Sequence, residues 1–162
     1  ISHLEEKGHT CMHEVSRAVT IAAQKEGIPQ LFLQDPLHFS EKILKGRLEQ
    51  FIEVPEWTEG YIFYDRGMPD VTAYMEYTAT NYPIAFSKTC KHNPYDAVFL
   101  LPPWEAIYSK DNERYESFEQ AKELYPFLKK SYQKFDYSAI EVPFGTIKYR
   151  AAFILDKLKI LF

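Results

Sequence analysis

Tyr61-Ile-Phe-Tyr-Asp65-Arg66-Gly67 is the most informative stretch of this sequence. Four apolar residues in a row predict a short strand that is buried on both faces, as strands of parallel sheets are. Asp65-Arg66-Gly67 ends the strand, and Pro69 suits the first turn of a helix that runs on to Tyr77. The stretch therefore predicts a strand, a polar turn and a helix in immediate succession.

The same alternation of apolar strands and amphipathic helices extends along the chain in both directions. Strands are expected at 10–14, 61–64, 97–101 and 138–142, and helices at 17–26, 37–52, 69–77, 111–135 and from Thr146 to the end. Residues 81–94 read as irregular, and Pro126 is expected to break or kink the helix that contains it. This order predicts a single α/β domain with a parallel sheet, right-handed crossovers and flanking helices.

Ligands of open parallel sheets bind beyond the carboxyl ends of the strands. Asp65 lies at such an end in a Walker-B-like pattern and could hold Mg²⁺ through water, while Arg66 could bind a phosphate with two parallel hydrogen bonds. Glu14 ends the preceding strand, with Arg17 one helical turn beyond it, and could act as a base on an acceptor hydroxyl. Solvated strand ends, or a Glu14–Arg17 pair at i,i+3, would explain the same residues without a function.

Three other groups are weaker candidates. Arg114, in Asp111-Asn-Glu-Arg114, could close over a transferring phosphoryl group, or belong to a solvated helix face. Pro143-Phe144-Gly145 could border a base pocket, or form a plain turn into a helix that Thr146 caps. Tyr74, Tyr77 and Tyr82 could stack on a nucleoside, but aromatic residues at helical spacing more often belong to a core.

Composition narrows the functional class. The formal net charge is −4, which argues against nucleic acid as a partner. No apolar run approaches the roughly 20 residues that span a bilayer. Cys11 and Cys90 are the only cysteines, which fits a reducing cytoplasm. Their pairing with His13 and His92 lacks the spacing of a zinc site.

No Gly-x-x-x-x-Gly-Lys-Ser/Thr loop occurs in the sequence. Residues 1–8 resemble the last turns of a helix that Gly8 closes, so the chain starts inside an element. We therefore expect a segment upstream of Ile1.

At this point the sequence resembles a known family, the small AAA-type P-loop ATPases related to the ribosylnicotinamide kinase domain of the bacterial NAD regulator. The matching segments run almost end to end: Glu14-Val-Ser-Arg17, Leu44-Lys-Gly-Arg-Leu-Glu-Gln50, Phe63-Tyr-Asp65-Arg66-Gly67-Met-Pro-Asp70, Tyr95-Asp-Ala-Val-Phe-Leu-Leu-Pro-Pro-Trp104, Asp111-Asn-Glu-Arg114, Ser117-Phe-Glu-Gln-Ala121, Val142-Pro143 and Arg150-Ala-Ala-Phe-Ile-Leu155.

The resemblance implies a P-loop nucleoside-kinase-like fold with a helical lid over residues 105–135. It implies a first strand and a Walker A loop upstream of Ile1, with that strand in the middle of the sheet. It also implies site roles: Asp65 near Mg²⁺, Arg66 on phosphate or acceptor, Glu14 and Arg17 on the acceptor side, Arg114 in the lid, and Pro143 and Gly145 near the adenine.

Three alternative hypotheses for the function are compatible with this sequence. The first is transfer of the γ-phosphate of ATP, with Mg²⁺, to a small nucleoside-like acceptor. The second is a nucleotide-binding regulatory ATPase or GTPase with a protein or lipid partner. The third is a non-catalytic α/β interaction domain derived from such an enzyme.

Overall fold

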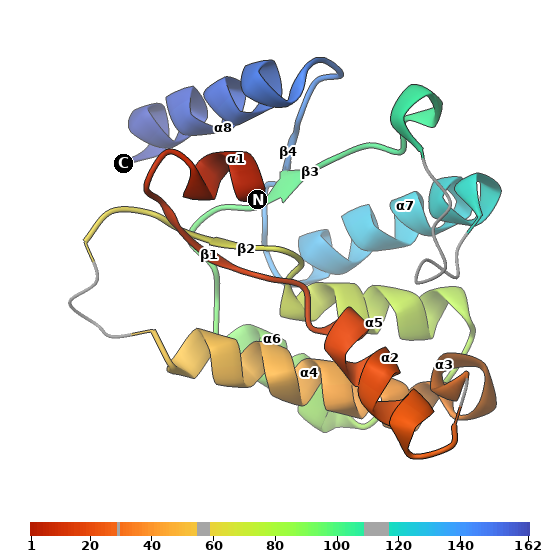
Figure 1. Cartoon of the computed structure of the whole chain (residues 1–162). Coiled ribbons are helices and arrows are strands. Elements are labelled where there is room, and N and C mark those ends of the chain that lie inside the picture. Colours follow the sequence, from red (N-terminus) through yellow and green to blue (C-terminus); the bar gives the residue numbers. More distant parts are fainter. Residues whose placement is uncertain (29, 55–58, 109–116) are drawn as a thin grey trace.

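The computed structural model describes residues 1–28, 30–54, 59–108 and 117–162, and Figure 1 shows its elements in order. The elements are α1 (Ser2–Glu5), β1 (Thr10–Met12), α2 (Ser16–Lys25), α3 (Leu31–Gln34), α4 (Pro36–Ile52), β2 (Ile62–Tyr64), α5 (Met68–Tyr77), α6 (Ile84–His92), β3 (Phe99–Leu100), the 3-10 helix η1 (Glu105–Ile107), α7 (Phe118–Lys134), β4 (Ile140–Glu141) and α8 (Ile147–Leu161). The expected α/β architecture is confirmed, and all paired strands of the described residues are parallel.

The described strands form two separate pairs. In the first, β1 lies beside β2 with Thr10 opposite Ile62 and Met12 opposite Tyr64. In the second, β3 lies beside β4 with Phe99 opposite Ile140. β2 and β3 face each other across a cavity of about 1080 Å³ that residues of both strands line, together with parts of α7 and α8. The two strand pairs are therefore separated by this cavity.

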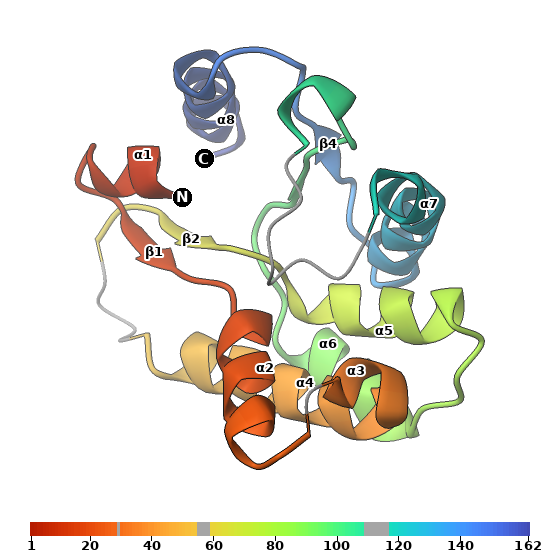
Figure 2. The same cartoon turned by 45° about the vertical axis from the view of Figure 1, so that its right-hand side comes forward.

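Helices cover both sides of the strands, as Figures 1 and 2 show. α1 packs on β1 and on α8 at one side, and α4, α5 and α6 pack together at the other. The core lies among these three helices, and its buried members are Ile43, Leu44, Met68, Val71, Met75, Phe86, Cys90 and Phe135. α5 is buried almost all round, because α4, α6 and α7 each pack against it.

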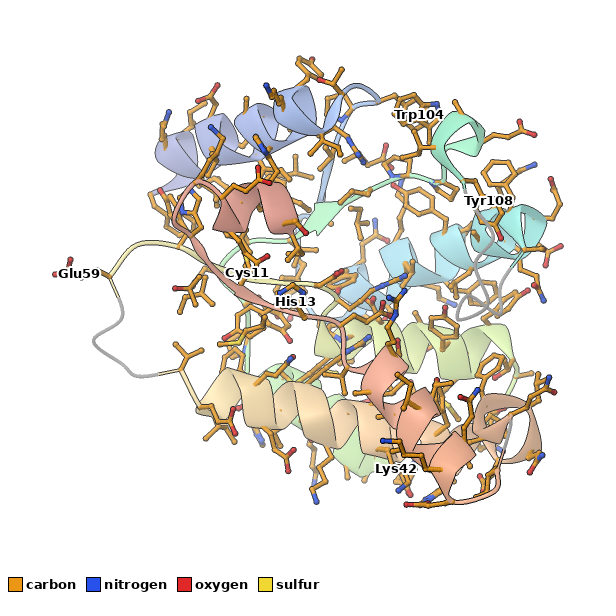
Figure 3. All side chains as sticks on the ribbon, viewed as in Figure 1. Cys11, His13, Lys42, Glu59, Trp104 and Tyr108 are labelled. Atoms are coloured by element: carbon orange, nitrogen blue, oxygen red, sulfur yellow. The ribbon has the colours of Figure 1, made fainter. Side chains whose placement is uncertain are left out.

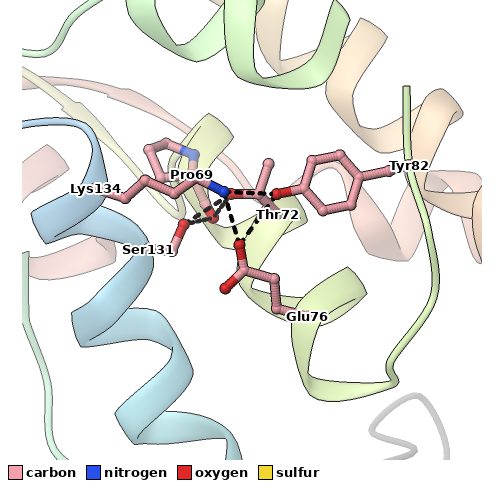
Figure 4. A network of polar contacts seen from close by, with 6 residues as sticks. All are labelled: Pro69, Thr72, Glu76, Tyr82, Ser131 and Lys134. Atoms are coloured by element: carbon pink, nitrogen blue, oxygen red, sulfur yellow. Dashed lines mark hydrogen bonds and ion pairs between the residues drawn. The ribbon is translucent and has the colours of Figure 1, made fainter. Parts of the chain in front are cut away.

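A network of polar contacts joins α5 to α7 (Figure 4). The hydroxyls of Thr72 and Ser131 lie 2.7 Å apart and both donate to the carbonyl of Pro69, at 2.9 and 2.7 Å. Both side chains are fully buried. At the exposed rim, the Lys134 ammonium donates to Glu76 at 2.9 Å and contacts the Tyr82 hydroxyl at 3.0 Å. These contacts fix α7 against the helix that follows β2.

Two expectations about elements were wrong. Residues 81–94 contain helix α6, because Phe86 and Cys90 at i,i+4 spacing bury one face against the core. Of the break or kink expected at Pro126, the break does not occur, because α7 runs unbroken from Phe118 to Lys134. Pro126 lies on the exposed face, where water can reach the carbonyl that loses its helical partner. A capping box between Ser117 and Gln120 secures the start of α7.

Candidate functional site

The carboxyl ends of β1 and β2 meet at the start of the site. The Asp65 amide donates to the Met12 carbonyl at 2.8 Å, so the pairing extends one residue past β2. Beyond that point the side chains of Glu14 and Arg66 approach each other, with Arg66 Nε 3.8 Å from Glu14 Oε1. Each of these side chains is about one third exposed, at 35%. The two strand ends thus bring the Glu14 carboxylate and the Arg66 guanidinium to the same place.

Arg66 has an uncommon backbone conformation, with φ at +83°. Non-glycine residues pay roughly 1–2 kcal/mol for the left-handed region, so surrounding contacts must hold the turn. Its guanidinium lies between two acids, because Nη1 is also 3.7 Å from the Asp70 Oδ2 atom. Strain of this kind often occurs at functional sites.

Three elements hold the turn formed by residues 65–70. Arg47 of α4 donates from Nη1 to the Gly67 carbonyl at 2.6 Å. The Met68 amide donates to the Tyr95 hydroxyl at 3.2 Å, and the Tyr132 hydroxyl of α7 donates to Asp70 Oδ1 at 2.6 Å. Burial, with the nearby Asp70 carboxylate, raises the pKa of Tyr132 well above its ordinary value, so the phenol keeps its proton.

A second cavity, of about 140 Å³, opens beside this turn. Glu14, Arg17, Arg47 and Arg66 supply its charged wall, and α3, α4 and α5 supply an apolar wall that includes Phe32, Phe39, Ile43, Val71, Tyr74 and Met75. Of the tyrosines considered from sequence, Tyr74 lines this cavity, whereas Tyr77 donates to Glu123 and Tyr82 packs on Phe86. We call this space the Arg47 cavity.

Ser16 begins α2 and orients Glu14. No side chain caps α2, and Ser16 Oγ donates to Glu14 Oε1 at 2.5 Å. Ser16 and Arg17 both line the Arg47 cavity. The start of α2 therefore positions Glu14 at the cavity wall.

The remaining sequence candidates lie elsewhere. Asp65 lines the larger cavity between β2 and β3. Pro143 and Gly145 follow β4, where the Phe144 ring stacks on Trp104 with ring centres 5.1 Å apart and an interplanar angle of 25°. Trp104 follows β3 (Figure 3), so this stack joins the ends of the second strand pair. Arg114 lies outside the described residues.

The expected lid range divides into different parts. Residues 105–107 form η1, residues 109–116 lie outside the described residues, and residues from Phe118 onward form α7. The second half of α7 contributes the buried Ser131 and Tyr132 to the contact with α5. A lid role stays a prediction.

The described residues contain neither a cluster of metal ligands nor a membrane-spanning helix. No three His, Cys, Asp or Glu side chains in residues 1–28, 30–54, 59–108 and 117–162 group as metal ligands. His13, labelled with Cys11 in Figure 3, instead pairs with Glu5 at 2.7 Å. Within the same ranges, no helix combines the length and apolar character that crossing a bilayer demands.

Sequence reasoning did not select Arg47, Asp70 or Tyr132 as site residues. A signal for Arg47 exists in the helix pattern, because it follows Ile43 by four residues and Leu44 by three, on the face that the core covers. A charged residue at a core position is rare without a partner or a function. Asp70 and Tyr132 are 62 residues apart, and no local pattern joins them.

The family comparison matches most of the chain. A family model described as an AAA domain covers residues 1–150. No curated protein and no solved structure matches the chain.

Proposed function

Because the chain belongs to the AAA domain family, a class of nucleotide-binding P-loop proteins, we propose that it is a phosphotransferase that moves the γ-phosphate of ATP to a small acceptor. The observation that carries this proposal is the Arg47 cavity, which opens where Glu14 and Arg66 meet at the ends of β1 and β2. A regulatory ATPase needs no small-molecule cavity at this place. The resemblance to ribosylnicotinamide kinases supports a nucleoside-like acceptor.

Glu14 is the base in this proposal. Among the described residues its contacts with Ser16 and Arg66 both fall on Oε1, which leaves Oε2 for an acceptor hydroxyl. Arg66 supplies positive charge for the oxygens of the transferring phosphoryl group. Glu14 and Asp70 hold its guanidinium from two sides, so little reorganisation is needed during the reaction.

Asp65 fits a magnesium ion. Its carboxylate directly follows β2 and lines the cavity between the strand pairs. A single protein carboxylate suits Mg²⁺, which keeps several waters and takes substrate phosphates as further ligands. When bound, the ion neutralises charge on the phosphates. Asp65 would orient it through water.

The cavity between β2 and β3 supports the expected additional strand. It is flanked by two parallel strands, and an unpaired strand edge is a template for further pairing. We infer that a parallel strand fills it and leads into a Walker A loop at the same sheet edge as Asp65. A Gly-rich loop ending in Lys-Ser/Thr within the residues that the gene encodes before Ile1 is the expected finding, and a reading frame without one would contradict it.

The adenine is proposed to lie by the Trp104–Phe144 stack. Phe144 is 54% exposed, and Pro143 and Gly145 flank it. Aromatic faces at the ends of the second strand pair can stack on a purine. Arg114 is proposed to close over the phosphates from the lid.

Acceptor-dependent ADP release tests the proposal, on the protein with any residues that its gene encodes before Ile1. A panel of hydroxyl-bearing small molecules should include at least one that raises ADP release with Mg²⁺–ATP. Asp65→Asn is nearly isosteric and should abolish turnover while leaving the fold intact. ADP release that no acceptor changes would favour a regulatory ATPase, and failure to bind Mg²⁺–ATP at all would favour an interaction domain.

A further inference from the structure

Arg47 is a buried cation with an incomplete set of partners. Its side chain is in α4 and is only 6% exposed. Nη1 donates to the Gly67 carbonyl, but Nε is buried without a hydrogen-bond partner, and no carboxylate of the described residues forms an ion pair with it. A guanidinium stays charged in proteins, so the cost of burying it cannot be relieved by loss of a proton.

Burial of an unpaired charge costs several kcal/mol even after relaxation. The Asp70 carboxylate and the Arg47 guanidinium both act electrostatically on the buried Tyr132 phenol, so the two charges lie near each other. The Asp70 oxygens, however, contact Tyr132 and Arg66 and not Arg47. Asp70 therefore lowers the cost of the Arg47 charge through space without satisfying its donors. Nη1 is bonded to Gly67 and Nε is inaccessible, whereas Nη2 forms no hydrogen bond with the described residues and is not among the buried atoms. Nη2 is therefore the donor that a partner in the cavity can reach, because Arg47 lines it.

The Arg47 cavity has the charge and size for such a partner. Arg17, Arg47 and Arg66 line it together with Glu14. Of these, Arg47 is the buried cation that forms no ion pair with a described carboxylate. Its volume of about 140 Å³ is close to that of cavities that hold one benzene ring. Its apolar wall includes Phe39, Val71 and Tyr74, which suit a flat or compact apolar body.

We propose that the Arg47 cavity binds a compact, ring-sized molecule through an anionic group, a carboxylate or a phosphate, placed against Arg47. This rests on the proposed function, in which the cavity holds the acceptor. In place of the nucleoside-like acceptor that the resemblance implies, it names a smaller acceptor with a negative charge on the side away from the reacting hydroxyl. A neutral acceptor can accept a hydrogen bond from Arg47 but leaves its charge without a counter-charge. A carboxylate or phosphate oxygen accepts from a guanidinium in a charge-assisted hydrogen bond.

Binding of benzoate and of benzamide tests this in the absence of ATP. The two probes have nearly the same shape and differ in charge. Titration calorimetry at constant ionic strength should show that benzoate binds roughly ten- to a hundredfold more tightly, as expected for a hydrogen bond to a charged group. Inorganic phosphate should compete with benzoate, which shows that the anion is what is recognised.

Two variants test whether the preference for benzoate depends on Arg47 or on positive charge elsewhere in the protein. Arg47→Met should remove the preference for benzoate. Arg150→Met is the matched control, because Arg150 also has a buried Nε without a partner but is not among the residues that line this cavity. The control should keep the preference. If Arg47→Met does not fold, the wild-type comparison of the two probes still decides.

Equal affinity for benzoate and benzamide, no binding of either benzoate or phosphate, or an unchanged preference in Arg47→Met would each overturn the proposal. These binding results do not depend on phosphoryl transfer. A protein that prefers anions here but never releases ADP would contradict the phosphotransferase and leave the anion site intact. A phosphotransferase that ignores benzoate would do the reverse.

Discussion

Gly67 and Tyr132 should be strongly coupled in stability. A methyl group at position 67 would lie 2.5 Å from the Tyr132 hydroxyl oxygen and 3.2 Å from a Tyr95 ring carbon. The Gly67 backbone, at φ −116° and ψ 166°, suits any residue, so Gly67→Ala perturbs the folded protein through these two contacts and not through its backbone. The hydroxyl cannot move away freely, because Tyr132 is 4% exposed and its hydroxyl donates to the buried Asp70.

The magnitudes follow from these contacts. Gly67→Ala should cost about 1–3 kcal/mol through overpacking. Tyr132→Phe should cost about 2 kcal/mol, because the Asp70 carboxylate loses a hydrogen bond at a buried position. In the Tyr132→Phe background the clashing oxygen is gone and the contact with Tyr95 at 3.2 Å remains, so Gly67→Ala should lose most of its cost but not all of it. The double variant should therefore be about 1–2 kcal/mol more stable than the sum of the single effects implies.

Urea denaturation of the four proteins measures this coupling. Additive effects within about 0.5 kcal/mol would refute the reasoning, because they would mean that the turn at residues 65–70 can move away from α7 at little cost. The turn would then be a poor platform for Asp65 and Arg66. Strong coupling would show that α7 holds the turn in place.

Two further predictions concern residues around the same turn. Arg66→Gly should leave the free energy of unfolding within about 1 kcal/mol of wild type, because relief of the positive φ offsets the loss of two partly exposed ion pairs. The same variant should abolish turnover. Arg66→Ala keeps the backbone strain, so denaturation should show that it is less stable than Arg66→Gly. The Lys134 and Tyr82 hydrogen bonds outweigh burial and lower the pKa of Glu76, so its contribution is present above pH 4.5 and disappears as pH falls through the lowered pKa. Glu76→Gln should therefore be about 0.5–1 kcal/mol less stable than wild type at pH 7, and this deficit should shrink as the pH falls below 4.5. Glu119→Gln, at an exposed pair, should change little. A Glu76→Gln deficit that does not shrink at acid pH would contradict the assignment.

Local sequence signals predicted the elements better than their contacts. The apolar run before Asp65, the Pro69 position and the Thr146 cap correctly placed β2, α5 and α8, because each is determined by nearby residues. The sequence did not predict α6, because its buried face consists only of Phe86 and Cys90 within a polar segment. The burial that stabilises it comes from tertiary packing on the core that α4 and α5 form, which no pattern within residues 81–94 shows.

The candidate site was predictable only in part. That Glu14 and Arg66 approach each other follows from parallel pairing, since neighbouring strands end at one edge. The support beneath them was not predictable, because Arg47 and Tyr132 reach the turn from helices 20 and 62 residues away from their respective partners, Gly67 and Asp70. Such tertiary contacts leave no spacing pattern in the sequence.

Transfer of label from [γ-³²P]ATP tests the central claim most directly. The protein, with any residues encoded before Ile1, is incubated with Mg²⁺, labelled ATP and hydroxyl-bearing acceptors that carry a carboxylate or phosphate. The account predicts a labelled small-molecule product in wild type and none in Asp65→Asn. Label that appears only as inorganic phosphate, whatever acceptor is present, would contradict the phosphotransferase.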